Sequence, residues 1–305
     1  MLRPELGELR DWFFGALLLG ALFLTVSQTL GWEKLLSPWH TLDWRTLLGA
    51  AGLTSLSYGL RALRIYDYFQ PRLRGRFSTV LRLSVLHNSA NNLLPMRVGE
   101  LVFPWLMKRY FRQKWTQSFQ SLLWIRLFDV HFLGLMGLLV LYLRDPGWLW
   151  PLLGLGWVGI LIPFAHSRQT QGDEPPAFWQ CLLATLPNSP GRFARIYLWT
   201  ALSWSLKLLS FVLILGHFLP LAHWQLLVGV LGAELSSVLP FHGIAGGGSY
   251  ELAALGALMP LGVSAEAALG GVVNLHLFLL GMTLSLGSLA LLLPKRPKDW
   301  HPPEN

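Results

Sequence analysis

The chain has 305 residues, of which 53% are hydrophobic and only 13% are charged, and its mean hydropathy is +0.45. A soluble globular domain carries about twice that share of charged residues, so the composition excludes an ordinary soluble protein. The net charge of +8 fits basic residues gathered in cytoplasmic loops better than nucleic-acid binding, and the single cysteine excludes an internal disulfide or a multi-cysteine metal site.

Several apolar runs reach the roughly 17–25 residues that a helix needs to cross a bilayer. These runs predict a polytopic all-α membrane protein with about six transmembrane helices. The N-terminal run is interpreted as an uncleaved first span, because acidic residues are mixed with its basic ones and no small-residue cleavage site follows. The six predicted spans are Trp12–Leu30, Thr46–Leu60, Ser118–Leu141, Trp148–Phe164, Tyr197–Phe218 and Ala265–Leu293.

Between the second and third spans, Val80–Met107 is apolar but contains the polar motif Asn91–Glu100. Basic residues flank it on both sides: Arg61, Arg64, Arg72, Arg74 and Arg76 before it, and Lys108, Arg109, Arg112 and Lys114 after it. Because basic flanks mark the cytoplasmic face, we expect a re-entrant hairpin, 80–107, that enters and leaves on that face. Each arm of about 14 residues would be about 21 Å long, short of the roughly 30 Å hydrocarbon core.

The second half of the chain contains a similar feature. After the turn Arg144–Gly147, the inward fourth span and a polar cytoplasmic linker, 165–196, the segment 224–259 contains a Leu-Pro step and a glycine-rich stretch inside apolar sequence. Its arms are also too short to span, which predicts a second hairpin from the external side. Hairpin-shaping residues are expected at both tips: Asn92, Pro95, Gly99, Pro240, Gly246 and Gly248.

The two halves, 1–145 and 146–305, then match as an inverted-topology repeat. Each half has two spans, a re-entrant hairpin and a further span, in opposite orientation. This is a common architecture of secondary transporters, whose substrate site lies near the bilayer midplane between the repeats. The distribution of basic residues places both termini in the cytoplasm.

Ionisable side chains inside hydrophobic segments are the candidate site. Each charge at the centre of a membrane helix costs about 2.5–3.5 kcal/mol on insertion scales, so these groups must pair or face water. One interpretation is that the ion pairs only hold helices together. The other is an anion site for a phosphate-bearing headgroup, because arginine donates a bidentate fork. The predicted substrate-binding residues are Arg97, Glu100, Arg126, Asp129, His242 and Glu251, with His242 the best candidate for a proton-sensitive group. The sequence predicts no metal site and no cofactor.

Three motifs carry a family resemblance. Asn91-x-x-Leu94-Pro95-x-Arg97-x-Gly99-Glu100, then Arg126-x-x-Asp129, then Leu239-Pro240 followed by Gly246-x-Gly248-x-x-Glu251 resemble the flippase-like family, the transmembrane module of the lysylphosphatidylglycerol synthases. The resemblance implies a bacterial or archaeal inner-membrane protein that handles polar lipids, here a stand-alone member without the aminoacyl-transferase domain. The chain departs from the pattern at Ala245, where relatives have glycine, and at Phe241–Ile244, where they are often rich in proline and glycine.

These features favour a flippase- or scramblase-like transporter of an anionic, polyprenyl-linked or hopanoid-linked lipid. The alternative is a membrane transferase on a lipid-linked sugar, with Glu100 or Glu251 as general base. A third hypothesis is an accessory subunit that anchors a soluble synthase through the 165–196 linker. The absence of an ATP-binding motif and of a soluble catalytic domain in this sequence favours a transporter over an enzyme. The expected partners are the lipid substrate and a lipid-modifying enzyme, soluble or membrane-bound, and not nucleic acid.

Overall fold

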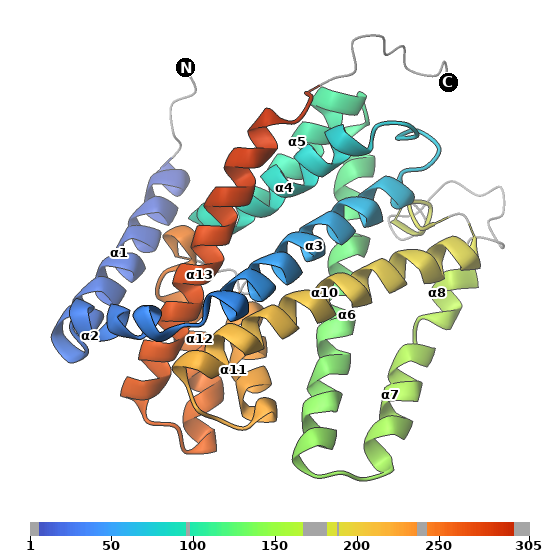
Figure 1. The fold of residues 1–305 in the computed structure, drawn as a ribbon. Coiled ribbons are helices and arrows are strands. Elements are labelled where there is room, and N and C mark those ends of the chain that lie inside the picture. Colours follow the sequence, from blue (N-terminus) through green and yellow to red (C-terminus); the bar gives the residue numbers. More distant parts are fainter. Residues whose placement is uncertain (1–5, 96–97, 167–181, 188, 237–242, 296–305) are drawn as a thin grey trace. The chain divides into compact units, whose positions relative to one another are not determined.

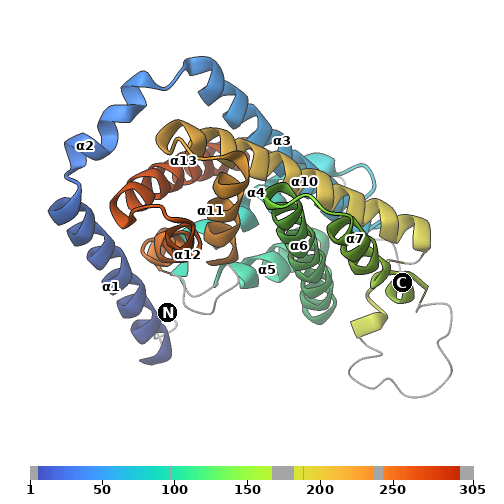
Figure 2. The same cartoon turned by 90° about the horizontal axis from the view of Figure 1, so that it is seen from below.

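The computed structural model describes residues 6–95, 98–166, 182–187, 189–236 and 243–295, and within them every regular element is a helix (Figures 1 and 2). This confirms the predicted all-α class. The longer helices are α1 (Leu6–Thr29), α3 (Trp44–Tyr68), α4 (Phe77–Leu93), α5 (Gly99–Phe111), α6 (Trp115–Arg144), α7 (Leu149–Gly159), α10 (Pro190–Phe218), α11 (His223–Ser236), α12 (Ser249–Leu258) and α13 (Ala265–Leu292). The short elements are α2 (Trp32–Leu36), η1 (Ser37–Thr41), α8 (Ile162–His166), η4 (Ile244–Gly246) and η5 (Met259–Leu261).

Four helical stretches in the described residues are long and apolar enough to cross a membrane: α6, the stretch Leu149–His166, α10 and α13. They match four of the six predicted spans. The first predicted span belongs to a pair, Ala16–Thr29 and Trp32–Thr41, that is bent by 97° and raises the total to five if it counts as one span. The second lies in α3, which has 25 residues but is not apolar enough to join this set.

Gly31 explains why the first helix stops. Its φ of +74° lies in the left-handed region that other residues rarely adopt. The amides of Leu30 and Gly31 both donate to the carbonyl oxygen of Val26, at 3.1 and 2.9 Å, and so satisfy the end of α1. A glycine in this conformation just past a helix end is a common terminator, and here it separates α1 from α2.

The chain forms two compact units. The first contains Met1–Ser55, Leu86–Glu100 and Lys207–Leu289, and the second contains Leu56–Val85, Leu101–Leu206 and Ala290–Asn305. Each unit draws on both of the predicted half-repeats. The division at 145/146 is therefore not a division between compact units, and the internal repeat stays a prediction.

In the first unit, α11 and α12 form a tightly packed pair (Figures 1 and 2). A Cβ added at Gly232 would lie 2.7 Å from the Ala257 Cβ, and one added at Gly229 would lie 3.0 Å from the Leu258 side chain. The later residue of α11 therefore meets the earlier residue of α12, so the two helices run antiparallel. Small residues allow this close approach, as is usual between helices in membranes.

In the second unit, α6 and α7 form another pair, joined by the turn predicted at 144–147 (Figure 1). Trp157 Nε1 donates to the His131 carbonyl oxygen at 2.9 Å, and the two rings stack with centroids 5.2 Å apart. The stretch Leu149–His166 is apolar, yet none of its 18 residues is buried inside the protein. Lipid tails would cover such a surface in a membrane.

Candidate functional site

The sequence-predicted site residues fall into separate groups. Glu100 and Glu251 belong to the first compact unit, and Arg126 and Asp129 belong to the second. Arg97, Pro240 and His242 lie outside the described residues. Each group is therefore described within its own unit.

Asp129, on α6, is the centre of a buried basic cluster in the second unit. Arg64 Nη1 donates to its Oδ1 at 2.5 Å, and Arg126 Nη1 donates to its Oδ2 at 3.2 Å. Trp204 Nε1 also donates to Oδ1, at 2.8 Å. The predicted i, i+3 pair Arg126–Asp129 is present, but Asp129 binds a second arginine more closely.

Arg61 completes this cluster. Its guanidinium carbon lies 4.7 Å from the centroid of the Trp204 ring, in a cation–π arrangement, and the residue is buried. We name Arg61, Arg64, Arg126 and Asp129 the arginine cluster. Three guanidinium groups and one carboxylate give it a formal charge of +2.

The sequence predicted Arg61 and Arg64 in a cytoplasmic basic segment; their burial was not predicted, and their side of the membrane stays a prediction. The structure continues α3 to Tyr68 and buries both residues, with exposures of 6% and 3%. The spacing Arg61-x-x-Arg64 within an extended helix was the available signal, because residues three apart share a helix face. Their partners on α6 and α10 are far away in the sequence, so the burial could not be predicted from spacing alone.

The junction between α4 and α5 positions Glu100 in the first unit. Asn91 Nδ2 donates to Glu100 Oε1 at 3.3 Å, and His87 Nε2 lies 3.8 Å from Glu100 Oε2. His87 Nδ1 lies 3.2 Å from the Gly99 carbonyl oxygen. Because that oxygen can only accept, Nδ1 carries the proton, and in the neutral ring Nε2 accepts from Asn91 Nδ2 at 3.3 Å.

Gly99 has a steric role at this tip. A Cβ there would lie 2.6 Å from the Ala90 carbonyl carbon and would also clash with Asn91, so no larger residue fits. Asn92, predicted to shape the hairpin, donates to the Thr283 hydroxyl of α13 at 2.9 Å, and Pro95 is buried. The start of α5 is therefore held against the end of α4.

Glu251 lies in the first turn of α12. Its Oε2 accepts from the Gly248 amide at 2.8 Å, which caps the helix, and its Oε1 lies 2.5 Å from His276 Nδ1 on α13. His276 Nε2 lies 2.8 Å from the Ala245 carbonyl oxygen and must donate to it. One further proton therefore sits between His276 Nδ1 and Glu251, as an imidazolium–carboxylate pair or as a carboxylic acid bound to a neutral imidazole.

The backbone before α12 explains the glycines there. Ala245 has φ +53°, in the left-handed region where glycine costs least, which accounts for the glycine expected at this position. Gly248 has φ +83°, and a Cβ there would lie 2.9 Å from the Leu18 carbonyl oxygen of α1. These conformations turn the Ala245 carbonyl towards His276.

A second buried ion pair, Lys207–Glu234, lies in the first unit. Lys207 Nζ, on α10, lies 2.6 Å from Glu234 Oε2, on α11. Both are ionisable residues within apolar segments of the sequence, and neither was among the predicted site residues. Among the described residues, no group of three or more His, Cys, Asp or Glu side chains could hold a metal ion.

Comparison with known families decides the class of protein. The family model of the lysylphosphatidylglycerol synthase TM region matches residues 12–287. The chain belongs to this family. No curated protein matches it. The resemblance predicted from the three motifs is therefore confirmed, and the protein is a multi-pass membrane protein of a family associated with lipid modification or flipping.

Buried arginines and a buried proton-sharing pair, in a lipid-handling membrane module, can bind an anion and hold a proton. Arginine forks suit phosphate oxygens, and a cluster away from bulk water binds an anion more strongly than an exposed one. The hydrogen bond between Glu251 and His276 holds one proton, which can lie on either partner without loss of that bond.

Proposed function

We propose that this member of the family is a flippase- or scramblase-like transporter that moves a polar lipid with an anionic headgroup across the bacterial or archaeal inner membrane. Polyprenyl-linked and hopanoid-linked lipids belong to the same proposal. The arginine cluster is the observation that carries it.

The charge of the cluster argues for an anion. A buried ion pair that only joins helices needs one cation for each carboxylate, whereas here Arg64 and Arg126 both hold Asp129, and a third guanidinium group, that of Arg61, lies over the ring of Trp204 beside it. The side chain of Arg126 is 27% exposed, against 4% for Arg64. Arg126 is therefore the member that an incoming headgroup would meet, while Arg64 fixes Asp129.

The helix lengths support the two re-entrant hairpins and hence a transporter architecture. α4 and α5 have 17 and 13 residues, and α11 and α12 have 14 and 10. At 1.5 Å per residue the longest arm is about 26 Å and the shortest about 15 Å, short of a roughly 30 Å hydrocarbon core. The inverted repeat, with both termini in the cytoplasm, remains part of the proposal.

The hairpin tips supply the second element of the mechanism. In the proposal, Glu100 and the Glu251–His276 pair gate the headgroup path or couple it to protons, and Arg97 and His242 contribute from the tips. This is supported by the buried position of Glu251, which is 2% exposed and shares a proton with His276. A lipid-modifying enzyme, soluble or membrane-bound, would supply or consume the transported lipid.

The experiment is headgroup accessibility in proteoliposomes. Fluorescent phosphatidylglycerol in the inner leaflet is assayed by dithionite quenching in vesicles with wild type, Arg97→Ala, Arg126→Gln or Arg45→Gln. Arg45→Gln is the matched control, because Arg45 is exposed at the start of α3 and outside the cluster. We expect wild type and Arg45→Gln to translocate the lipid and both other variants to be at least about tenfold slower, since hydrogen bonds to charged groups are worth about 1.5–3 kcal/mol.

Equal rates of lipid translocation in wild type and Arg126→Gln would show that the arginine cluster is not part of the transport site. Translocation no faster than in empty vesicles, by wild type with every anionic and polyprenyl-linked lipid tried, would overturn the proposal. Turnover of a lipid-linked sugar donor in detergent would then favour the transferase.

A further inference from the structure

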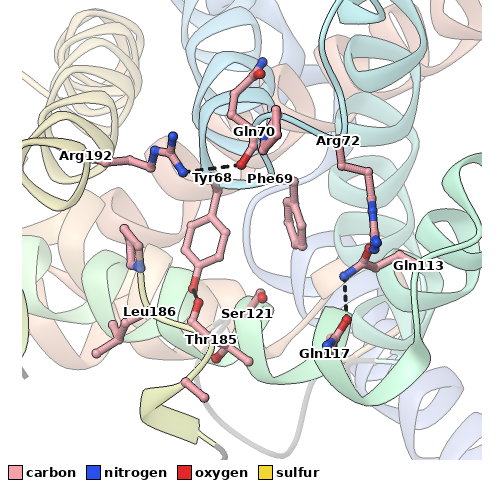
Figure 3. Close-up of a pocket in the computed structure, with 13 residues that line it drawn as sticks. Tyr68, Phe69, Gln70, Arg72, Gln113, Gln117, Ser121, Thr185, Leu186 and Arg192 are labelled. Carbon is pink, nitrogen blue, oxygen red and sulfur yellow. Dashed lines mark hydrogen bonds between the residues drawn. The ribbon is translucent and has the colours of Figure 1, made fainter. Parts of the chain in front are cut away.

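A cavity of about 300 Å³ lies in the second compact unit, apart from the arginine cluster. Figure 3 shows its lining, which comes from the end of α3 and the loop after it, from the start of α6, from residues 184–187 and from the start of α10. None of the three motifs that carry the family resemblance contributes a residue to this lining.

The charge of the lining is one-sided. Arg72 and Arg192 line the cavity, and among the described residues of the lining there is no aspartate or glutamate. Arg72 Nη1 donates to the side-chain oxygen of Gln113, and Arg192 Nη1 donates to the backbone oxygen of Gln70 at 3.3 Å (Figure 3). Both guanidinium groups thus bind neutral oxygens, which leaves their charge available to a ligand.

The nearest carboxylate on α3 is already compensated. Asp67 accepts from Arg195 Nε and Nη2 at 2.5 and 2.6 Å, and from Trp199 Nε1 at 3.2 Å. A bidentate pair of this kind uses both carboxylate oxygens. Asp67 is thus offset mainly by Arg195, and it interacts with the lining residue Arg192 only at a distance, through the field of its charge.

Neutral polar groups and the amino ends of two helices also favour an anion in this cavity. Gln113 Nε2 donates to Gln117 Oε1 at 3.0 Å, and Ser121 follows one turn later on α6 (Figure 3). α6 and α10, of 30 and 29 residues, both begin at this cavity. The amino end of a helix carries a partial positive charge and favours anions.

We propose that this cavity binds a phosphate group, as a phosphomonoester or phosphodiester, with Arg72 and Arg192 as its principal ligands. Arginine is suited to phosphate because its fork donates two parallel hydrogen bonds. Tyr68 and Phe69 provide an aromatic wall for an uncharged remainder, and the Tyr68 hydroxyl is fixed on the Thr185 carbonyl oxygen at 2.7 Å. The volume of about 300 Å³ lies at the lower end of the range for small-molecule sites, which suits a small headgroup.

The phosphate can belong to a lipid headgroup or to a soluble metabolite, and the two share this chemistry. The proposal goes beyond lipid transport and does not rest on it. Either can fail alone, because the variants here leave the arginine cluster intact.

The test measures binding to the full chain purified in a phosphate-free maltoside detergent. Isothermal titration calorimetry uses inorganic phosphate and glycerol 3-phosphate as probes, with wild type, Arg72→Gln, Arg192→Gln and Arg74→Gln. Arg74→Gln is the matched control, because Arg74 is exposed in the same loop, does not line the cavity and loses the same charge. Thermal unfolding without ligand establishes that each variant is folded.

We expect saturable binding that weakens about tenfold or more in Arg72→Gln and in Arg192→Gln and is unchanged in Arg74→Gln. Competition by dihexanoyl phosphatidylglycerol, below its micellar concentration, would assign the site to a lipid headgroup. Binding without that competition would assign it to a soluble phosphate. Absence of binding to wild type, or an equal loss in Arg74→Gln, would overturn the proposal.

Discussion

At the scale of single residues, the buried pair Lys207–Glu234 makes a direct prediction. Replacing Lys207 by methionine leaves the Glu234 carboxylate buried beside no ammonium group, and breaking a buried pair in this way costs about 3–5 kcal/mol. The double variant Lys207→Met with Glu234→Leu removes both charges, and we expect it to recover most of that loss. Thermal unfolding in detergent measures both. A double variant no more stable than the single one would show that the pair is not coupled.

The spacing of residues in the sequence predicted some members of the candidate site and missed others. Arg126 and Asp129 are three residues apart on one helix, so the pair could be read from the sequence. Glu251 was also predicted, but its partner His276 comes from α13, 25 residues later. The burial of Arg61 and Arg64 depends on Asp129 and Trp204, which reach α3 only through tertiary packing. Periodicity carries no information about such contacts.

At the scale of helices, the antiparallel pair α11–α12 depends on small residues at its contact. A Cβ at Gly232 would lie 2.7 Å from the Ala257 Cβ and 3.0 Å from the Ala253 carbonyl oxygen, which is backbone and cannot move aside. We expect Gly232→Ala to destabilise the protein by about 1–3 kcal/mol, as overpacking does. A lower midpoint of thermal unfolding in detergent would show this.

Gly256, on α12 itself, is the control for this prediction, because a Cβ there meets nothing within 4 Å. Gly256→Ala removes a helix-destabilising glycine and should be neutral or more stable by up to about 1 kcal/mol. Similar losses in both variants would mean that helix propensity, rather than the contact between α11 and α12, determines the result.

Helix positions were predictable from the sequence wherever apolar runs are long. α6, α10 and α13 match predicted spans, and the breaks within 80–107 and 224–259 coincide with separate short helices. The second predicted span ends at Leu60, whereas the helix α3 continues to Tyr68. A prediction from hydropathy ends the span where the arginines begin. The helix itself can continue, because these arginines are buried against an aspartate and a tryptophan.

At the scale of the whole molecule, the proposed topology can be tested because the chain has one cysteine. Replacing Cys181 by serine gives a cysteine-free background for single cysteines at positions that the structure exposes. We propose Arg74→Cys for a cytoplasmic position, and Pro146→Cys and Pro220→Cys for external ones. The excess of basic residues around Arg74 places it inside by the positive-inside rule.

In intact cells, a membrane-impermeant maleimide should label the cysteines at 146 and 220 and not the one at 74, which becomes accessible only after lysis. The reverse pattern would invert the whole topology. A fourth variant, Glu33→Cys, tests the bent pair at the N-terminal end, because Glu33 is exposed just after the 97° bend. Labelling from outside means that α1 crosses the membrane and the N-terminus lies on the predicted cytoplasmic side. Protection until lysis means that Ala16–Thr29 and Trp32–Thr41 enter and leave on the cytoplasmic face. With position 74 also cytoplasmic, α3 then does not cross either, which removes two of the six spans and breaks the match between the two half-repeats.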